Sequence, residues 1–323
     1  MSAPTLTQRA QAFLAERRRL GFQARSTGYA LISFARHIDR LGHQGPLTVE
    51  LMADWARRDK WQRGTPETWA ARLKRLRPFT RWLRQFEPGT AVPDESIFGP
   101  VPGRVAPHIY REEEILALLA AARGLNPKGG LRPATYETLF GLIASAGLRV
   151  SEALALRDAD VDLTAGTLTV RQTKFAKSRQ LPLHPSTVQA LARYRRRRCR
   201  DVRTSAETPF FIGSRGRRLG QALGQRQVHR VFIELRDRLR WINRGAHDGP
   251  RIHQLRHSFA VRRVMLWHGQ GIDIDQAMLS LSTYLGHAKI SNTYWYLTGV
   301  PELMALAGKR FERFAEAPGA GDE

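Results

Sequence analysis

The sequence predicts a mainly α-helical protein with one small antiparallel β-sheet, an α+β fold class, arranged in two domains. Apolar residues recur at helical spacing along most of the 323 residues. Residues 160–184 instead alternate with the period of a strand. Prolines and glycines gather over residues 88–107, where a helix cannot continue. These three observations predict an all-helical first domain, a linker, and a second domain that holds the sheet.

The first domain, residues 1–87, is predicted to contain four amphipathic helices. Turn signals at Gly21, residues 42–46 and residues 64–66 separate them. Pro78 is expected to kink or interrupt the fourth helix, because proline removes a backbone donor. The apolar positions of the first two helices are Phe13, Leu14, Leu20, Leu31, Phe34, Ile38 and Leu41.

Residues 88–107 form the predicted linker, and residues 108–323 form the second domain. That domain is expected to open with helices over residues 112–122 and 133–146, the latter ending at Gly147, and with a third helix beyond. The strand pattern follows, with Pro182 marking an edge strand. Further helices are predicted over residues 227–241, 253–267, 274–285, 291–297 and 301–314.

The charge of the chain favours a polyanionic partner. Its 52 basic residues against 29 acidic ones give a formal net charge of +23. Residues 1–107 carry 18 basic and 9 acidic residues (+9), and residues 108–323 carry 34 and 20 (+14), so both domains are basic. Such a field attracts nucleic acid. We therefore expect nucleic acid to be the leading partner class.

The compartment is predicted from what the sequence lacks. Cys199 is the single cysteine, so no intrachain disulfide can form. The sequence has neither a leader-like N-terminus nor an apolar span long enough for a membrane helix. We expect a cytoplasmic protein without a membrane partner.

Four separated segments carry candidate chemistry. They are AGLRVSEALAL at 146–156, QTKFAKSRQLPL at 172–183, HQLRHSFA at 253–260 and LGHAKISNTYWYL at 285–297. Transesterification at a phosphodiester needs a nucleophile, a proton acceptor, an acid for the leaving group, and cations for the developing charge. The four segments together offer tyrosine, histidine, lysine and arginine for these tasks. The set requires no metal and no other cofactor.

In this order the segments resemble the catalytic domain of the tyrosine recombinases, also called the phage integrase family. The family pattern is an arginine after Gly-Leu, a hairpin lysine, His-x-x-Arg, and Leu-Gly-His with a tyrosine nine residues beyond. The resemblance covers roughly residues 108–314 and extends more loosely over the first domain. It implies a SAM-like helical core DNA-binding domain followed by the catalytic domain.

The resemblance also implies a role for each matching residue. Tyr296 is the expected nucleophile, which forms a 3′-phosphotyrosine with DNA. His253 is the expected base and Lys174 the expected acid for the departing 5′-oxygen. The remaining matches are the phosphate-binding residues Arg149, Arg256 and His287, with Glu152 in a supporting position.

Other interpretations of these residues stay open. Lys177 lies three residues from Lys174, and both side chains could simply contact the DNA backbone. His253 and His257 have the spacing of a helical zinc pair, with His287 as an imaginable third ligand. Against zinc, Gln254 stands where the HExxH motif has glutamate, and Arg256 would repel a cation.

Two other features test the fit to the family. Gln254 also departs from the family, since many relatives carry an acidic residue there, which leaves the local support of His253 and Arg256 open. Tyr284 and Tyr294 are competing phenols. Tyr284 is expected in the core, and Tyr294 is two positions short of the family spacing.

The predicted activity is site-specific cleavage and rejoining of DNA through a Holliday junction, in integration, excision or resolution. The resemblance implies double-stranded DNA as the partner, a homotetramer on two recombination sites, and association with the bacterial nucleoid. Accessory recombinases are further candidate partners. Residues 301–314 could pack on a neighbouring protomer or on their own domain. The alternatives are a type IB topoisomerase or hairpin telomere resolvase, and a catalytically silent DNA-binding accessory protein of a mobile element. A transposon or phage integrase and a chromosome-dimer resolvase both fit the sequence.

Overall fold

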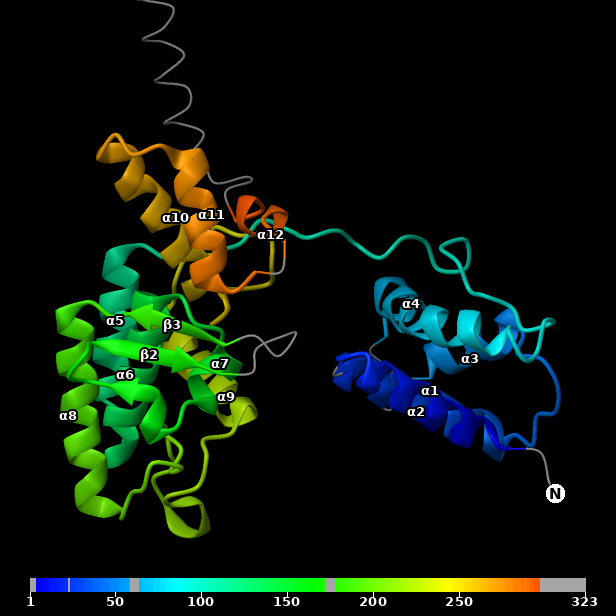
Figure 1. The fold of residues 1–323 in the computed structure, drawn as a ribbon, viewed down its shortest axis with the longest axis horizontal. Helices are drawn as coiled ribbons and strands as arrows, with labels where there is room; N and C mark the ends of the chain where they lie inside the picture. Colours follow the sequence, from blue (N-terminus) through cyan, green and yellow to red (C-terminus); the bar gives the residue numbers. More distant parts are fainter. Residues whose placement is uncertain (1–3, 23, 59–63, 172–177, 288, 297–323) are drawn as a thin grey trace, which may run out of the picture. The chain divides into compact units, whose positions relative to one another are not determined.

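The structure is a computed structural model of the whole chain, and it describes residues 4–22, 24–58, 64–171, 178–287 and 289–296. The chain divides into two compact units, Met1–Arg104 and Val105–Glu323 (Figure 1). Unit 1 is helical, and unit 2 combines helices with a three-stranded sheet. The predicted fold class is therefore confirmed. No helix among the described residues is long and apolar enough to cross a membrane.

Unit 1 contains the four predicted helices, α1 (Leu6–Arg19), α2 (Arg25–Arg40), α3 (Val49–Arg57) and α4 (Pro66–Leu83). Threonine side chains at positions 5, 48 and 65 cap α1, α3 and α4 by accepting from backbone amides of the first turn. The Asp39 carboxylate adds a tertiary cap, accepting from the amides of Leu6 and Thr7 at 2.9 and 3.0 Å. Local caps and one long-range contact thus fix where α1 begins.

Pro78 does not interrupt α4, which continues to Leu83. Phe79 and Leu83 on the far side of the proline are fully buried with Leu73 and Leu76 before it. Burial of such side chains is worth about 1.5–3 kcal/mol each, which offsets the lost backbone hydrogen bond. The expected break is therefore absent, because the helix packs into the core on both sides of Pro78.

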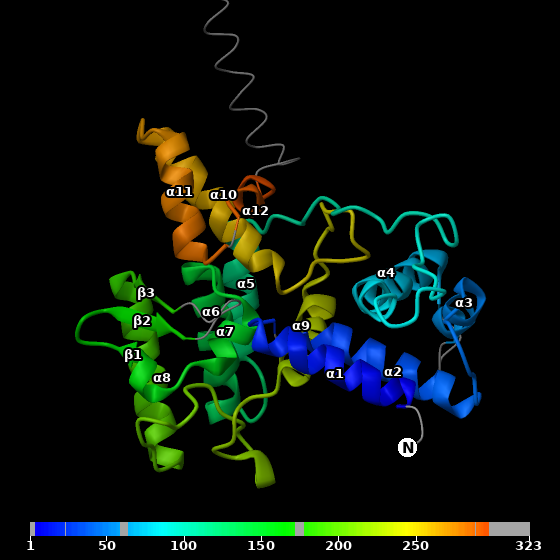
Figure 2. The same ribbon diagram turned by 45° about the vertical axis from the view of Figure 1, so that its right-hand side comes forward.

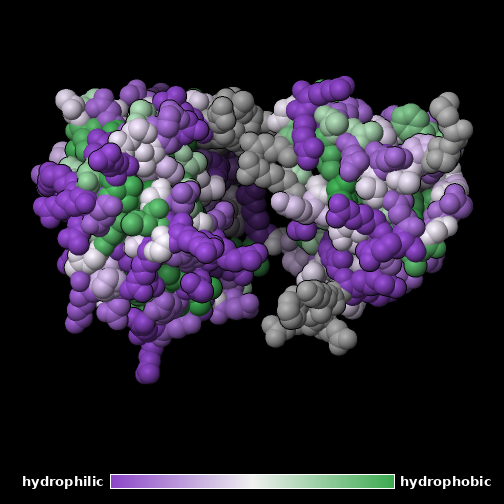
Figure 3. All heavy atoms as spheres, turned by 90° about the horizontal axis from the view of Figure 1, so that it is seen from below, coloured by the Kyte–Doolittle hydropathy of each residue, from purple (hydrophilic) through white to green (hydrophobic). Residues whose placement is uncertain are grey.

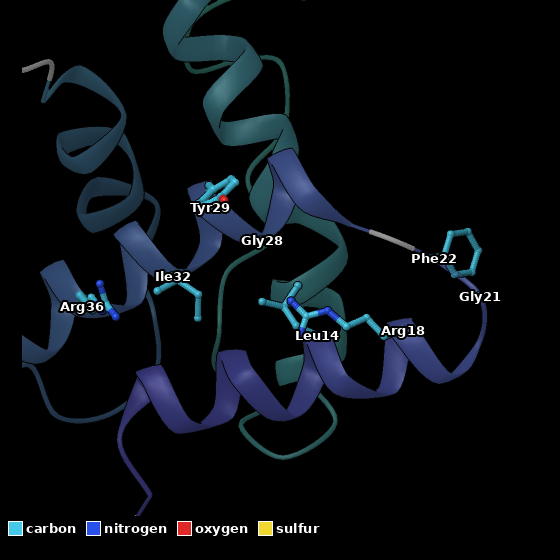
Figure 4. Close-up of a pocket in the computed structure, with 8 residues that line it drawn as sticks. All are labelled: Leu14, Arg18, Gly21, Phe22, Gly28, Tyr29, Ile32 and Arg36. Carbon is cyan, nitrogen blue, oxygen red and sulfur yellow. The ribbon is translucent and has the colours of Figure 1, made fainter. Parts of the chain in front are cut away.

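A crevice between α1 and α2 marks the surface of unit 1 (Figure 4). Leu14 and Ile32 lie at its base, while Phe22 and Tyr29 are 41% and 81% exposed. The Arg17 guanidinium carbon lies 3.9 Å from the Phe22 ring centroid, a cation–π contact. On the face seen in Figure 3, hydrophilic side chains cover much of each unit and leave separate apolar patches.

Unit 2 begins with α5 (Glu112–Arg123), α6 (Leu131–Ala146) and α7 (Val150–Ala155). The antiparallel sheet follows, with β1 (Val161–Asp162), β2 (Thr167–Val170) and β3 (Arg179–Pro182) in the order β1-β2-β3. Pro182 is on an edge strand as predicted. Leu168, Val170 and Leu181 are buried at alternate positions, which confirms the period-two pattern.

Five further α-helices follow the sheet among the residues that the structure describes. They are α8 (Pro185–Asp201), α9 (Gln225–Leu239), α10 (Gln254–Gly269), α11 (Ile274–Leu285) and α12 (Ser291–Tyr294). In both views α10 and α11 lie side by side, with α12 next to them (Figures 1 and 2). The sequence interpretation missed α8, because its buried positions Thr187, Leu191, Tyr194 and Arg198 include two polar residues and so give no apolar stripe.

Candidate active site

Two helix ends form the frame of the candidate site. α6 ends at Gly147 and α11 ends at Gly286, both with positive φ, +61° and +67°. A Cβ at Gly147 would lie 2.4 Å from the Phe259 ring, and one at Gly286 would lie 2.7 Å from a guanidinium nitrogen of Arg179. Both turns therefore need glycine, for backbone conformation and for space. The sequence interpretation had used Gly147 only as a helix end.

The carbonyls at these helix ends accept hydrogen bonds from arginines. Arg256 donates from Nη1 to the Gly147 carbonyl and from Nη2 to the Leu285 carbonyl, both at 2.7 Å. Arg149 donates from Nη2 to the Gly286 carbonyl at 3.4 Å. The last carbonyls of a helix lack intrahelical partners and carry partial negative charge, so they favour cations. Segments more than a hundred residues apart are joined in this way.

The Glu152 carboxylate is the common partner of three arginines. It accepts from Arg149 Nη1 at 2.6 Å and from Arg179 Nη1 and Nη2 at 3.2 and 2.9 Å, and it lies 3.7 Å from Arg256 Nη1. Burial by itself would raise the pKa of this carboxyl, but the Arg179 contacts and the other arginines lower its pKa to about 2. Glu152 is therefore ionised at neutral pH and holds the cluster together.

Arg179 is the member of the cluster that the sequence interpretation missed. It begins β3, and its Nε donates to the Tyr284 carbonyl at 2.8 Å. The available signal was a third basic residue in the connection that also contains Lys174 and Lys177. Those two lysines, the expected acid and its alternative, lie outside the described residues.

His287 is held between Thr293 and Arg256. Its Nε2 lies 3.0 Å from Arg256 Nη2, and its Nδ1 lies 2.7 Å from Thr293 Oγ1. Arginine can only donate, so Nε2 accepts and Nδ1 carries the proton of a neutral ring. Burial and the positive charges of Arg256 and Arg149 lower the pKa of His287 to about 3, which agrees with that state. Thr293 is a further residue that the motif alone did not single out.

Tyr296 lies within this arrangement. Its side chain is 6% exposed, and its hydroxyl accepts from Arg256 Nε at 3.4 Å. Its ring meets His257 edge-to-face, with centroids 4.2 Å apart, and His287 at 5.2 Å. Arg256 is fully buried, and burial lowers its pKa. The described residues thus place one phenol directly against one guanidinium.

His253 and His257 occupy successive turns at the start of α10. Their ring centroids are 5.1 Å apart, and His253 reaches solvent whereas His257 is 5% exposed. Partial desolvation, followed by the charges of Arg256 and Arg149, holds the pKa of His253 below its ordinary value. Desolvation, followed by the charge of His253, lowers the pKa of His257 to about 3. Among the described contacts it is His257, and not His253, that touches Tyr296.

The competing tyrosines lie outside the cluster. Tyr284 stacks on Phe259 with centroids 5.7 Å apart and packs against the core of unit 2, as predicted. Tyr294 is 40% exposed, and its hydroxyl donates to Asp275 at 3.4 Å. Five of the seven predicted residues, Arg149, Glu152, Arg256, His287 and Tyr296, therefore form one contact network, with His253 beside it. The geometry defines a buried, arginine-rich site around a single phenol.

Comparison with known proteins agrees with this class of site. Residues 109–300 match the model of the phage integrase family. The chain is 40% identical over 315 residues to the putative integrase/recombinase y4rB of Sinorhizobium fredii, covering 96% of this chain and 98% of that protein. It is 31% identical over 252 residues to the tyrosine recombinase XerC of Chlorobaculum parvum, covering 72% and 68%.

A solved structure of the Tn1549 transposon integrase with transposon right end DNA has a similar fold, with a TM-score of 0.63 and 16% identity. The match covers 95% of this chain and 99% of that one. The chain belongs to the phage integrase family, the tyrosine recombinases.

Proposed function

We propose that this protein is a site-specific DNA recombinase that cleaves and rejoins strands with Tyr296 as nucleophile. The observation that carries the proposal is the Arg256 Nε contact to the Tyr296 hydroxyl, inside a cluster that Glu152 holds together. Guanidinium groups bind the oxygens of a phosphodiester through charge-assisted hydrogen bonds. A phenol beside them is placed to attack the phosphorus that they hold.

The chemistry balances with the groups that we assign. The Tyr296 oxygen forms a bond to phosphorus, the bond from phosphorus to the 5′-oxygen breaks, and the DNA 3′ end stays on the enzyme. His253 takes the phenol proton, and Lys174 gives a proton to the 5′-oxygen. The phosphotyrosine retains the energy of the broken bond, so the reverse attack by a 5′-hydroxyl rejoins the strand without ATP.

Arginines and His287 stabilise the transition state in this scheme. Arg149 and Arg256 bind the non-bridging oxygens, and neutral His287 can donate a hydrogen bond after a ring or proton rearrangement. Arg149 keeps 31% of its side chain exposed, so it is accessible to DNA. Arg256 is fully buried beneath Tyr296, so the phosphate can reach it only after the phenol moves. We propose that the described arrangement is the closed form, which opens on DNA.

The rest of the chain has matching tasks. We assign residues 1–87 to core DNA binding, residues 88–107 to the linker, and residues 108–323 to catalysis. Four protomers on two recombination sites would exchange strands in two pairs through a Holliday junction, with or without accessory recombinases. A mobile-element integrase and a chromosome-dimer resolvase both use this scheme. The relative y4rB, which is 40% identical, is named a putative integrase/recombinase, and this name fits both.

Covalent capture of DNA tests the proposal. Wild type, Tyr296→Phe and Tyr294→Phe are incubated with nicked duplexes that carry sequences from the flanks of the gene, and denaturation-resistant adducts are measured. We expect a 3′-linked adduct with wild type and with Tyr294→Phe, whose phenol faces Asp275. It should be absent with Tyr296→Phe. An adduct that survives in Tyr296→Phe would refute the assignment of the nucleophile, and binding without any adduct would favour the silent accessory protein.

A further inference from the structure

Helix α8 has two opposite faces of different chemistry. Thr187, Leu191, Tyr194 and Arg198 are buried against unit 2. Arg193, Arg196 and Arg200 are exposed, and at about 100° per residue they lie within about 60° of one another on the opposite face. We call these three residues the α8 arginine stripe.

The stripe has no acidic partner in the part of the protein that the structure describes. Among the described residues, no carboxylate lies within 4.0 Å of these three guanidiniums. Arg195 and Arg198 on the other faces do pair with Asp158. Basic residues in the last turn complement the helix dipole, which accounts for Arg200 but not for Arg193 or Arg196 in the middle of α8. The stripe therefore needs another explanation.

A neighbouring loop extends the charge. Residues 213–220 fold back on themselves and include exposed Arg215, Arg217 and Arg218. A Cβ at Gly220 would lie 3.3 Å from a methyl group of Val202, so this basic loop packs against the C-terminal end of α8. Val202 lies about 180° around the helix axis from Arg193, so the basic loop adds positive charge beside the end of α8 and is not part of the face that carries the stripe.

This surface runs away from the candidate active site. The Thr187 hydroxyl near the start of α8 lies 3.2 Å from the Ser145 hydroxyl near the end of α6, and Gly147 of the site is two residues further along the chain. Arg200 lies about 20 Å further along the helix axis at 1.5 Å per residue. In both ribbon views the C-terminal end of α8 is on the side of unit 2 opposite α11 and α12 (Figures 1 and 2).

We propose that the α8 arginine stripe binds a second segment of duplex DNA, separate from the duplex at the active site. Protein–DNA interfaces are polar and strongly positive, whereas the anchors of protein interfaces combine arginine with buried tryptophan and tyrosine side chains. No large apolar side chain of α8 is exposed, and Leu219 beside it is a single residue 42% exposed. The inference rests on the proposed function, because an enzyme that joins two duplexes gains from holding a second one nearby.

A capture assay tests this surface. Full-length protein is loaded on an immobilised biotinylated duplex of arbitrary sequence at low salt, and a second, fluorescent duplex of arbitrary sequence is then added. The test variant is R193Q/R196Q/R200Q, and the charge-preserving control is R193K/R196K/R200K. We expect equal loading of all three proteins, with second-duplex capture about tenfold or more lower for the glutamine variant, because three phosphate contacts are lost.

Each other outcome has a defined meaning. If wild type does not load on the first duplex, the proposed DNA function itself fails. If wild type loads but captures nothing, or if the glutamine variant captures as well as wild type, the stripe holds no second duplex. Equal losses in loading and capture would place the stripe on the first duplex and overturn the inference. The inference also fails if the glutamine variant loses binding of poly-glutamate but captures the second duplex as well as wild type. That result would indicate an acidic protein partner. Thermal unfolding checks that the variants are folded.

Discussion

Replacing Glu152 by glutamine should destabilise unit 2 through the arginine cluster. The change keeps the shape of the side chain but removes the charge that contacts Arg149, Arg179 and Arg256. In the folded protein the pKa of Glu152 is about 2, against about 4.5 for a glutamate in water. This difference corresponds to roughly 3 kcal/mol of unfolding free energy at neutral pH. Breaking a buried ion pair costs a similar amount, about 3–5 kcal/mol.

The pH dependence has a definite sign. Because the folded pKa is the lower one, the Glu152 contribution is fully present above about pH 4.5 and is lost as pH falls towards about 2. The difference between wild type and Glu152→Gln should therefore be largest at neutral pH and shrink in acid. Urea unfolding followed by tryptophan fluorescence measures it, with m-values compared to detect separate unfolding of the two units.

A matched control uses an exposed ion pair in the same unit. Glu137 pairs with Arg123 at 2.6 Å, but the Arg123 side chain is 70% exposed. Glu137→Gln should therefore change the unfolding free energy by less than about 1 kcal/mol. An unfolding free energy of Glu152→Gln within about 1 kcal/mol of wild type would refute the role of this carboxylate. So would a difference from wild type that does not change with pH below about 4.5.

Two further changes test the frame of the site. Gly147→Ala should lower the free energy of unfolding by about 1–2 kcal/mol, because alanine disfavours the left-handed conformation. The close contact of the new methyl group with the Phe259 ring should lower it further. Gly129 has a φ of +69° and open space around it, so Gly129→Ala should show only the conformational part of this loss. Equal losses of unfolding free energy in the two variants would show that the Phe259 contact adds nothing. His257→Ala should slow single-turnover adduct formation about tenfold by releasing the Tyr296 ring, whereas His257→Phe should keep most of the rate. An unchanged rate in His257→Ala would show that the ring contact does not position the nucleophile.

The sequence by itself determined the helices with regular apolar spacing, the strand alternation at Leu168, Val170 and Leu181, and the identity of the motif residues. These follow from local rules, because helix and strand periods, caps and glycine turns are set by neighbours a few residues apart. α8 escaped these rules, since its buried Arg198 is stabilised by Asp158 and by the Pro209 and Phe210 carbonyls from other segments.

Tertiary structure alone decided how the motif residues meet. Arg179 became the main partner of Glu152, His257 became the ring against Tyr296, and Arg256 became fully buried beneath the phenol. These contacts form where the glycine turns at the ends of α6 and α11 come together. The hydrogen bond from Arg149 to the Gly286 carbonyl, for example, joins residues 137 positions apart in the chain. No local pattern encodes such a contact, because it arises when separate helices pack and their unpaired terminal carbonyls find the same arginines.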